Sequence, residues 1–181
     1  MIIIVGKTAS GKDTVVKKLV DDYKYTKIIT YATRPMRKGE QQDITYHFVT
    51  EEEFMQRINE GLFAEYKSYN TEFGTWYYGT ALDDIQNADD KSVIILTPQG
   101  YRDIKDSLPE KNIICIYLYA NNSTIKKRLE KRGDSNKEAD RRLEKDTEDF
   151  KGFEKEADRI VYNNDGTDIN DVIDKILKVI R

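Results

Sequence analysis

The sequence predicts a three-layer α/β/α fold in which helices cover both faces of a five-stranded parallel sheet. Short apolar runs of the kind that is buried on both faces recur along the chain. Stretches with helical periodicity separate these runs, so strands and helices alternate. The first run leads through a glycine-rich loop into a helix, as expected for an α/β unit. At 181 residues the chain has the size of one ordinary domain.

The elements of the central layers follow from this alternation. Each strand is expected where a short apolar run is bounded by polar or turn residues. The expected strands are residues 2–5, 27–30, 93–96, 113–118 and 159–162. The expected helices lie at about residues 15–20, 80–88, 101–108, 123–132, 138–153 and 172–180, and Thr80 is expected to cap the second of them.

A smaller lobe is expected to interrupt the sheet after its second strand. Its helix begins at Thr50, because Thr50 and Glu53 have the spacing of a capping box, and it ends at Gly61. Aromatic runs on either side of residues 70–72 predict a hairpin. The expected elements of the lobe are a strand at 46–49, the helix at 50–61 and hairpin strands at 63–69 and 73–78.

The composition argues against several classes of function. The 30 basic and 33 acidic residues give a net charge of −3, which argues against a general nucleic-acid surface. No apolar run has the ~18 residues of a membrane span, and none reads as a signal peptide, so a cytoplasmic protein without a membrane partner is expected. Cys115 lies in an apolar run and is expected to be an inert core thiol. His47 is the only histidine, so histidine catalysis has no support.

A phosphate-binding loop follows the first strand. The pattern Gly-x-x-x-x-Gly-Lys spans Gly6 to Lys12 between a buried-type strand and a helix, the context that this motif requires. Consecutive backbone N–H groups can wrap a phosphate there, the helix N-terminus adds partial positive charge, and Lys12 can reach the outer phosphates. A nucleoside triphosphate is the expected ligand. The expected binding residues are Gly6, Lys7, Thr8, Ala9, Ser10, Gly11, Lys12, Asp13 and Thr14, with Asn163 in the turn after the last strand.

Asp13 departs from the usual pattern of such loops. A Ser or Thr normally stands after the lysine and offers its hydroxyl to magnesium, and Thr14 comes one residue too late. Two interpretations remain open. The Asp13 carboxylate binds Mg²⁺ directly or through water, or it caps the helix.

Arginines at two places in the chain indicate a second anionic ligand. Arg34 and Arg37 lie in a loop that contains proline and glycine, whereas Arg128, Arg132 and Arg142 lie on two helices around residue 133. Guanidinium groups facing the loop would suit a second phosphate-bearing substrate. Solvated helix faces are the alternative for Arg132 and Arg142. They are the expectation for Lys126, Lys127, Lys131 and Arg141.

The chain resembles the guanylate kinase family along nearly its whole length. The resemblance is carried by the block Thr33-Arg34-Pro35-Met36-Arg37-Lys38-Gly39-Glu40, by Tyr46 and Glu65, by Tyr77-Tyr78-Gly79-Thr80, by Gln99-Gly100, by residues 127–133 and by Arg141-Arg142-Leu143. It implies one domain over residues 1–181 that transfers a phosphoryl group from ATP, with Mg²⁺, to GMP or dGMP. The implied parts are a core at 1–32, 81–125 and 155–181, a lobe for the nucleoside monophosphate at 33–80, and a lid at about 126–154.

The resemblance also assigns residues to the acceptor and to the chemistry. The implied acceptor-binding residues are Thr30, Arg34, Arg37, Glu40, Tyr46, Glu65, Tyr78, Gly79, Thr80 and Thr97. The Glu65 carboxylate could accept from guanine N1–H and N2–H, whereas adenine would leave it facing a lone pair. No general base is needed, because the attacking phosphate oxygen is already ionised. The residues expected to be catalytic are Lys12, Arg34, Arg128, Arg132 and Arg142.

The chain departs from the family at the end of the third strand. Ile95 and Thr97 stand where guanylate kinases usually carry two aspartates linked to guanine and magnesium, and Asp13 would compensate for them under the first of its two interpretations, Mg²⁺ binding. The run between Glu65 and Tyr78 is longer than usual and the lid is slightly shorter. Two alternatives stay open: a related kinase with another phosphorylated acceptor, and a non-catalytic module like the guanylate-kinase-like domains of scaffold proteins. The oligomeric state does not follow from the sequence.

Overall fold

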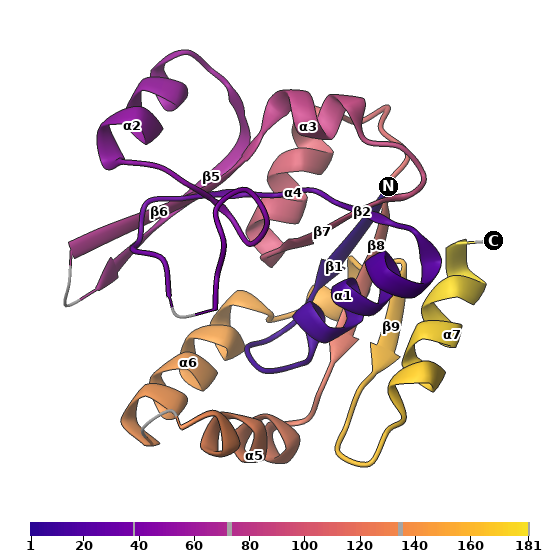
Figure 1. Ribbon diagram of the computed structural model, residues 1–181. Helices are drawn as coiled ribbons and strands as arrows, with labels where there is room; N and C mark the ends of the chain where they lie inside the picture. The colour runs from indigo at the N-terminus through magenta and orange to yellow at the C-terminus, as the bar shows by residue number, and fades with distance from the viewer. Residues whose placement is uncertain (38, 72–73, 134–135, 181) are drawn as a thin grey trace.

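The central layer of the molecule is a five-stranded parallel sheet. The computed structural model describes residues 1–37, 39–71, 74–133 and 136–180 (Figure 1). Its strands β1 (Ile2–Val5), β2 (Thr26–Lys27), β7 (Ser92–Leu96), β8 (Ile114–Tyr119) and β9 (Arg159–Tyr162) lie in the order β2-β7-β1-β8-β9. Every pairing among them is parallel. The predicted fold class is confirmed.

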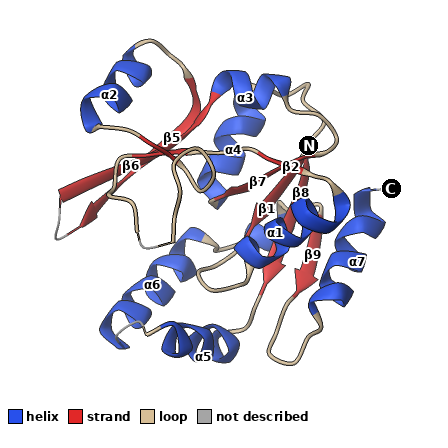
Figure 2. Cartoon of the chain, viewed as in Figure 1, coloured by secondary structure: helices blue, strands red, loops and turns tan. Residues whose placement is uncertain are grey.

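Helices cover both faces of this sheet. Helices α1 (Lys12–Tyr23) and α7 (Ile169–Ile180) pack on one face, and α3 (Leu82–Asn87) and α4 (Pro98–Ser107) pack on the other (Figure 2). Alternate residues of β1 pack against the helices on opposite faces of the sheet, because successive strand side chains point to opposite faces. Ile2 and Ile4 pack with the α1 and α7 layer, and Ile3 and Val5 pack with the α3 and α4 layer. This explains why the strand is apolar throughout.

A second, smaller sheet forms the inserted lobe. Its strands β3 (Tyr31–Ala32), β4 (His47–Phe48), β5 (Phe63–Thr71) and β6 (Gly74–Ala81) lie in the order β4-β3-β6-β5, and helix α2 (Glu51–Asn59) packs on it. The helix is attached through Phe54, whose ring stacks on Phe63 with 4.5 Å between centroids. Aromatic residues of the predicted hairpin therefore hold α2 against the sheet.

The β5–β6 hairpin is longer than the sequence predicted. Asn70 and Thr71, which were expected in the turn, are paired with Thr75 and Gly74 in the ladder. The predicted turn residue 72 and the predicted strand start at 73 lie outside the described residues. The pairing continues because Thr71 Oγ1 donates to Gly74 O at 2.7 Å and Thr75 Oγ1 donates to Asn70 Oδ1 at 3.0 Å.

Two helices, α5 (Asn122–Arg132) and α6 (Asn136–Asp149), form a pair beside the central sheet (Figure 1). Gly133 ends α5 with a left-handed φ of 88°. The second helix was expected to continue to residue 153 and stops at Asp149. Gly152, with φ of 79°, turns the chain into a short 3₁₀ helix, η1 (Phe153–Lys155). This turn lets Phe150 and Phe153 both pack on Tyr117 in the core.

Two expectations about local structure have opposite outcomes. The capping box at α2 is confirmed, since Glu53 N donates to Thr50 Oγ1 at 3.2 Å and Thr50 N donates to Glu53 Oε2 at 2.8 Å. The expected cap at Thr80 is wrong. Thr80 lies inside β6, and α3 begins after Ala81, which makes no side-chain cap hydrogen bond. The hydroxyl of Thr80 has another partner, described below.

Burial explains the behaviour of the single cysteine. Cys115 lies in β8 with no exposed surface, and burial raises the pKa of its thiol to about 12. The expected inert core thiol is confirmed. Within the described ranges, none of the helices combines the length and apolar character needed to cross a membrane.

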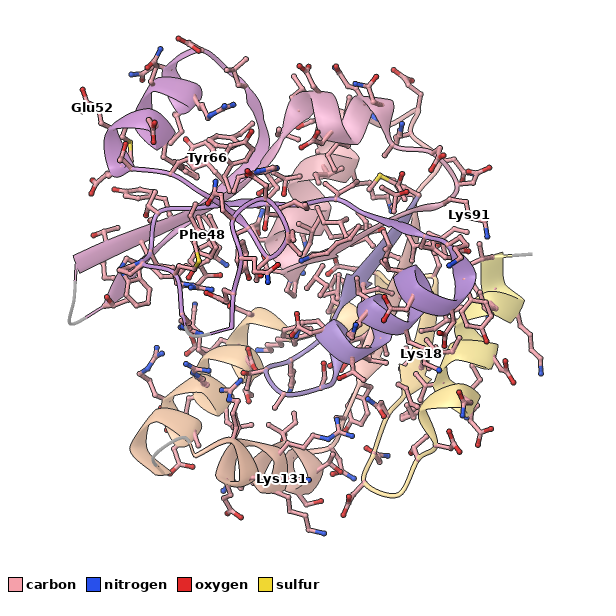
Figure 3. The ribbon with its side chains drawn as sticks, in the orientation of Figure 1. Lys18, Phe48, Glu52, Tyr66, Lys91 and Lys131 are labelled. Carbon is pink, nitrogen blue, oxygen red and sulfur yellow. The ribbon has the colours of Figure 1, made fainter. Side chains whose placement is uncertain are left out.

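Replacing the N-cap residue of α2 tests the local energetics of the lobe. Thr50→Ala removes the side-chain acceptor of one helix N–H, and we expect the free energy of unfolding to fall by about 1 kcal/mol in a urea titration. Glu52→Ala, at a neighbouring exposed residue (Figure 3), is the control and should change it by less than about 0.5 kcal/mol. Equal effects of the two substitutions would contradict the cap.

Candidate functional site

The phosphate loop, residues 6–11, connects β1 to α1 in a conformation that requires glycine. A Cβ at Gly6 would lie 2.6 Å from both Leu118 O and Ser10 Oγ. Gly11 has φ of 99°, a left-handed value that L side chains rarely adopt. The two glycines of the motif are therefore needed for close packing on β8 and for the turn into the helix.

Two polar side chains from distant parts of the chain hold the outer surface of this loop. The Arg128 guanidinium donates to Ala9 O and Ser10 O, each at 3.1 Å, and to Asn163 O at 3.0 Å. Asn163 Nδ2 donates to Ser10 O at 2.8 Å. Neither side chain lines the cavity described below. Arg128 was predicted to be catalytic and Asn163 to bind ATP, and the structure places both as supports of the loop.

Lys12 lies at the start of α1 and folds back over the loop. Its Nζ donates to Gly6 O at 2.7 Å and to Lys7 O at 2.9 Å. Burial lowers the pKa of this ammonium group, and the carboxylates of Asp13 and Asp146 oppose that shift. The loop thus holds a partly buried cation beside its backbone amides, which is the arrangement that a phosphate group needs.

Asp13 is exposed on the first turn of α1. The N-cap of this helix is Gly11, which makes no side-chain cap hydrogen bond, so Asp13 is not the cap. Its carboxylate lies near enough to Lys12, Lys27 and Tyr46 to oppose the fall in the pKa of both lysines and to add to the rise that burial causes at Tyr46. The Asp13 carboxylate is therefore close enough to Lys12 on the loop side and to Tyr46 on the lobe side to influence both, although it does not line the cavity between them.

A cavity of about 1180 Å³ separates the loop from the lobe and from α6. It exceeds the ~300–1,000 Å³ that is usual for one small ligand, so it has room for two nucleotides. The predicted site residues that line it are Gly6, Thr8, Lys12, Thr30, Arg34, Arg37, Tyr46, Glu65, Tyr78, Gly79, Thr97 and Arg142. Those outside its lining are Lys7, Ala9, Ser10, Gly11, Asp13, Thr14, Glu40, Thr80, Arg128, Arg132 and Asn163.

On the lobe side of the cavity, Arg34 is held in place by Glu40. The guanidinium is only 4% exposed and donates to both carboxylate oxygens of Glu40, at 2.6 and 2.5 Å. It also lies over the rings of Tyr46 and Phe48, 5.1 and 5.4 Å from their centroids. Hydrogen bonding to Arg34 lowers the pKa of the Glu40 carboxyl. Glu40 was predicted to bind substrate, and the structure places it as the partner that orients Arg34.

Glu65 presents a carboxylate to the cavity from strand β5 of the lobe. Thr80 Oγ1 donates to Glu65 Oε1 at 2.6 Å, and the other oxygen lies 3.0 Å from the point where Gly100 would carry a Cβ. Burial raises the pKa of Glu65, although the hydrogen bond from Thr80 acts in the other direction. Gly100 thus leaves room for this carboxylate, and Thr80 fixes its orientation from outside the cavity.

The end of β7 carries no carboxylate. Thr97 is the N-cap of α4, with its Oγ1 accepting from Gly100 N at 3.1 Å, and Ile95 lines the cavity as an apolar side chain. In the part of the chain that the structure describes, no three His, Cys, Asp or Glu side chains gather as a metal-binding group. A cation at this site would thus have to take its remaining ligands from water and phosphate oxygens.

Several residues that line the cavity were not predicted from the sequence to belong to the site. The hairpin contributes Lys67, Tyr69, Asn70, Thr71 and Trp76. Helix α6 contributes Arg141, Lys145, Asp146 and Asp149, and Phe150 follows directly after its last residue. The α6 set could have been found, because Lys145, Asp146 and Asp149 follow Arg142 at helical spacings of three, four and seven. The hairpin set had no such signal.

The expected solvated cations have mixed outcomes. Lys126, Lys127 and Lys131 are exposed, and Lys131 points away from the body of the molecule (Figure 3). Arg141 is exposed as well, but it lines the cavity and is therefore more than a solvated face. Arg132 is the exposed last residue of α5 and does not line the cavity.

An α/β sheet whose first strand feeds a phosphate loop, with a basic cavity in front of that loop, is the architecture of a P-loop nucleotide kinase. The family model described as "Guanylate kinase" matches residues 1–181. The chain therefore belongs to the guanylate kinase family.

Individual relatives agree with this assignment. The chain is 32% identical over 186 residues to a guanylate kinase of Prochlorococcus marinus, covering 100% of this chain and 96% of that protein. It is 30% identical over 171 residues to one of Campylobacter jejuni, covering 91% and 81%. The crystal structure of guanylate kinase from Anaplasma phagocytophilum superposes with a TM-score of 0.69 at 20% identity, covering 100% of this chain and 84% of that one, which shows the shared fold.

The Arg34–Glu40 pair predicts a pH dependence of stability. The folded state lowers the pKa of Glu40 below its ordinary value of 4.5, so the carboxylate stabilises the fold above that pH and the contribution is lost as the pH falls. Glu40→Gln should lower the free energy of unfolding by about 2 kcal/mol at pH 7, because a buried guanidinium loses its charged partner.

Urea titrations from pH 7 to pH 3 measure this difference, which should shrink below pH ~4.5 as the wild-type carboxyl becomes protonated. Glu52→Gln controls for the loss of one exposed negative charge. A difference between Glu40→Gln and wild type that stays constant over the whole range would contradict the pairing.

Proposed function

We propose that this chain transfers the γ-phosphoryl group of ATP to GMP or dGMP. One observation carries the proposal. A single cavity has the phosphate-loop amides and Lys12 on one side and the preorganised Arg34 and Glu65 on the other. Membership of the guanylate kinase family and the names of the relatives support the same reaction. The alternatives of another acceptor and of a non-catalytic module gain no support from the comparisons.

Glu65 is proposed to select the base. Its carboxylate accepts from N1–H and N2–H of guanine, while Thr80 keeps one carboxylate oxygen in place from behind. An adenine in the same position would set the N1 lone pair against a buried carboxylate. Unpaired groups of this kind lower kcat/KM by roughly 10⁴-fold. Thr30, Gly79 and Thr97 line the same cavity and complete the proposed acceptor site.

The acceptor phosphate is proposed to bind at the other end of the lobe. The positive charges of Arg34 and Arg37 and the hydroxyls of Tyr46 and Tyr78 suit a dianion. In this division residues 33–80 hold the acceptor, about 126–154 form a lid, and the remainder of the chain is the core that holds ATP. The reaction takes place in the cytoplasm without nucleic acid or a membrane.

The transfer needs positioning and charge neutralisation but no general base. An ionised oxygen of the acceptor phosphate attacks the γ-phosphorus of ATP, the bond from that phosphorus to the β–γ bridging oxygen breaks, and ADP leaves with the electron pair. Lys12, Arg34 and Arg142 are the cations of the cavity proposed to neutralise the transferring group. Arg128 is proposed to act on the transferring group indirectly, by holding the phosphate loop in place. Arg132 is proposed to reach the transferring group when the lid closes.

Asp13 is proposed to hold Mg²⁺. The residue fits, because it offers an exposed hard-oxygen ligand next to Lys12, and Mg²⁺ in nucleotide kinases needs only one or two carboxylates besides water and phosphate. When bound, the ion neutralises charge on the phosphates. This ligand would replace the carboxylates that are missing at residues 95 and 97.

An assay of acceptor choice tests the proposed function. ADP formation is followed with ATP and each of GMP, dGMP, AMP, CMP and UMP, and we expect GMP or dGMP to react fastest. Glu65→Gln should lower kcat/KM for GMP about 100-fold, because a charged hydrogen bond is lost at the base. Glu51→Gln, at an exposed residue of α2, is the matched control. AMP as the best acceptor would refute the role of Glu65.

The magnesium proposal has its own test. Asp13→Ser should raise the Mg²⁺ concentration needed for half-maximal turnover by about tenfold, as expected when a hydroxyl replaces a charged ligand. Asp21→Ser removes an exposed carboxylate from the same helix and should leave this concentration unchanged. An unchanged magnesium dependence in Asp13→Ser would show that Asp13 is not the compensating ligand.

A further inference from the structure

An acidic side chain of α6 reaches into the phosphate loop. Thr8 N donates to Asp146 Oδ2 at 2.7 Å, although the two residues are 138 positions apart in the chain. Both residues line the large cavity. The backbone N–H of Thr8 belongs to the set of amides that a P-loop uses for anions, so a carboxylate lies where the donor phosphates are expected.

Opposing interactions act on the charge of the Asp146 carboxylate at this position. Burial raises the pKa of Asp146, and the positive charges of Lys12 and Lys7 together with the hydrogen bond from Thr8 oppose that rise. Asp149, one turn further along α6, adds negative charge to the same region. The Asp146 carboxylate is thus stabilised by the features that would stabilise a phosphate: an amide of the loop and its lysines.

Asp146 also belongs to the helix that supplies the opposing charge. Arg142 and Lys145 line the cavity from the same face of α6, and Lys145 Nζ lies 3.0 Å from Asp149 Oδ1. Lys67 of the hairpin lies 4.0 Å from the other oxygen of Asp149. A contact that ties Asp146 to the loop therefore also sets where α6 and its cations lie in front of that loop.

We infer that Asp146 acts as a built-in competitor of the donor phosphate, which holds α6 against the phosphate loop until ATP displaces it. The inference rests on the proposed function, since it requires the loop to be the ATP site. The Asp146 carboxylate and the ATP phosphates would compete for the same two partners, the Thr8 backbone N–H and the positive charge of Lys12. Part of the nucleotide-free population is then unable to bind ATP, and the apparent affinity is lower by that fraction.

Calorimetry of ATP binding in the presence of Mg²⁺ and the absence of acceptor tests the inference. Asp146→Ala removes the competitor, and we expect the Kd of ATP to fall about tenfold, as when the competent fraction rises from about one tenth to nearly all molecules. Asp146→Asn keeps an oxygen that can accept from Thr8 N but loses the charge, so its Kd should be intermediate. Glu148→Ala removes an exposed carboxylate from the same turn of α6 and should leave the Kd unchanged.

Hydrogen exchange of the Thr8 amide provides a second readout that does not depend on nucleotide. We expect this amide to be protected in the nucleotide-free wild type and in Glu148→Ala, and to exchange about tenfold faster in Asp146→Ala. Loss of the contact without a change in ATP affinity would overturn the competition. A higher Kd in Asp146→Ala would overturn it too and would identify Asp146 as a group that assists ATP binding.

The ATP-binding experiment and the acceptor assay together show whether the competitor role of Asp146, the proposed function, or both are wrong. A wild-type enzyme that phosphorylates GMP, together with an Asp146→Ala variant of unchanged ATP affinity, refutes only the competitor. A wild-type protein and variants that bind no ATP refute both. Tighter ATP binding by Asp146→Ala in a protein that phosphorylates none of the five monophosphates would support the competitor and refute the proposed acceptor.

Discussion

The site depends on how the carbonyl groups of the phosphate loop are satisfied. A loop that turns its N–H groups toward a ligand turns several carbonyls away from it, and buried carbonyls need donors. Arg128 and Asn163 supply donors to the carbonyls of Ala9 and Ser10, and Lys12 supplies them to Gly6 and Lys7. Gly6 permits the close contact with β8. The loop is therefore held from outside before any ligand arrives.

The lobe side of the cavity is organised in the same manner, through polar groups whose partners are part of the protein. Arg34 is held by Glu40 and by aromatic rings, and Glu65 is held by Thr80. Such pairs are costly to break, because the remaining group stays buried without its partner. Preorganisation of this kind reduces the entropy that must be lost when substrates bind, which suits a reaction that depends on positioning.

The departures from the family pattern have local explanations. Thr97 is used as the cap of α4, so the end of β7 contributes a helix start in place of a carboxylate. The longer β5–β6 hairpin brings Lys67, Tyr69 and Trp76 to the cavity, and burial raises the pKa of the Tyr69 hydroxyl to about 12. The cavity is therefore bounded by aromatic groups from the hairpin as well as by Glu65.

Features that arise from local patterns could be predicted from the amino-acid sequence alone. The buried strands, the phosphate loop, the α2 capping box and the end of α5 at Gly133 were predicted, because periodicity, glycine and capping act over a few residues. The ends of two elements differ from the prediction. Strand β5 is longer, because its pairing with β6 continues through Thr71, and α6 is shorter, because Phe153 packs in the core.

The pairing of polar groups from distant parts of the chain became visible once the elements were packed together. The contacts of Arg128 with the loop, of Glu65 with Thr80 and of Asp146 with Thr8 join separate elements of the chain. Spacing along the sequence carries no information about such pairs, since they arise from how the layers, the lobe and α6 pack around one cavity. Arg128 and Glu40 were predicted to act on the ligands, and the structure adds contacts that the sequence did not show: Arg128 with the phosphate loop and Glu40 with Arg34.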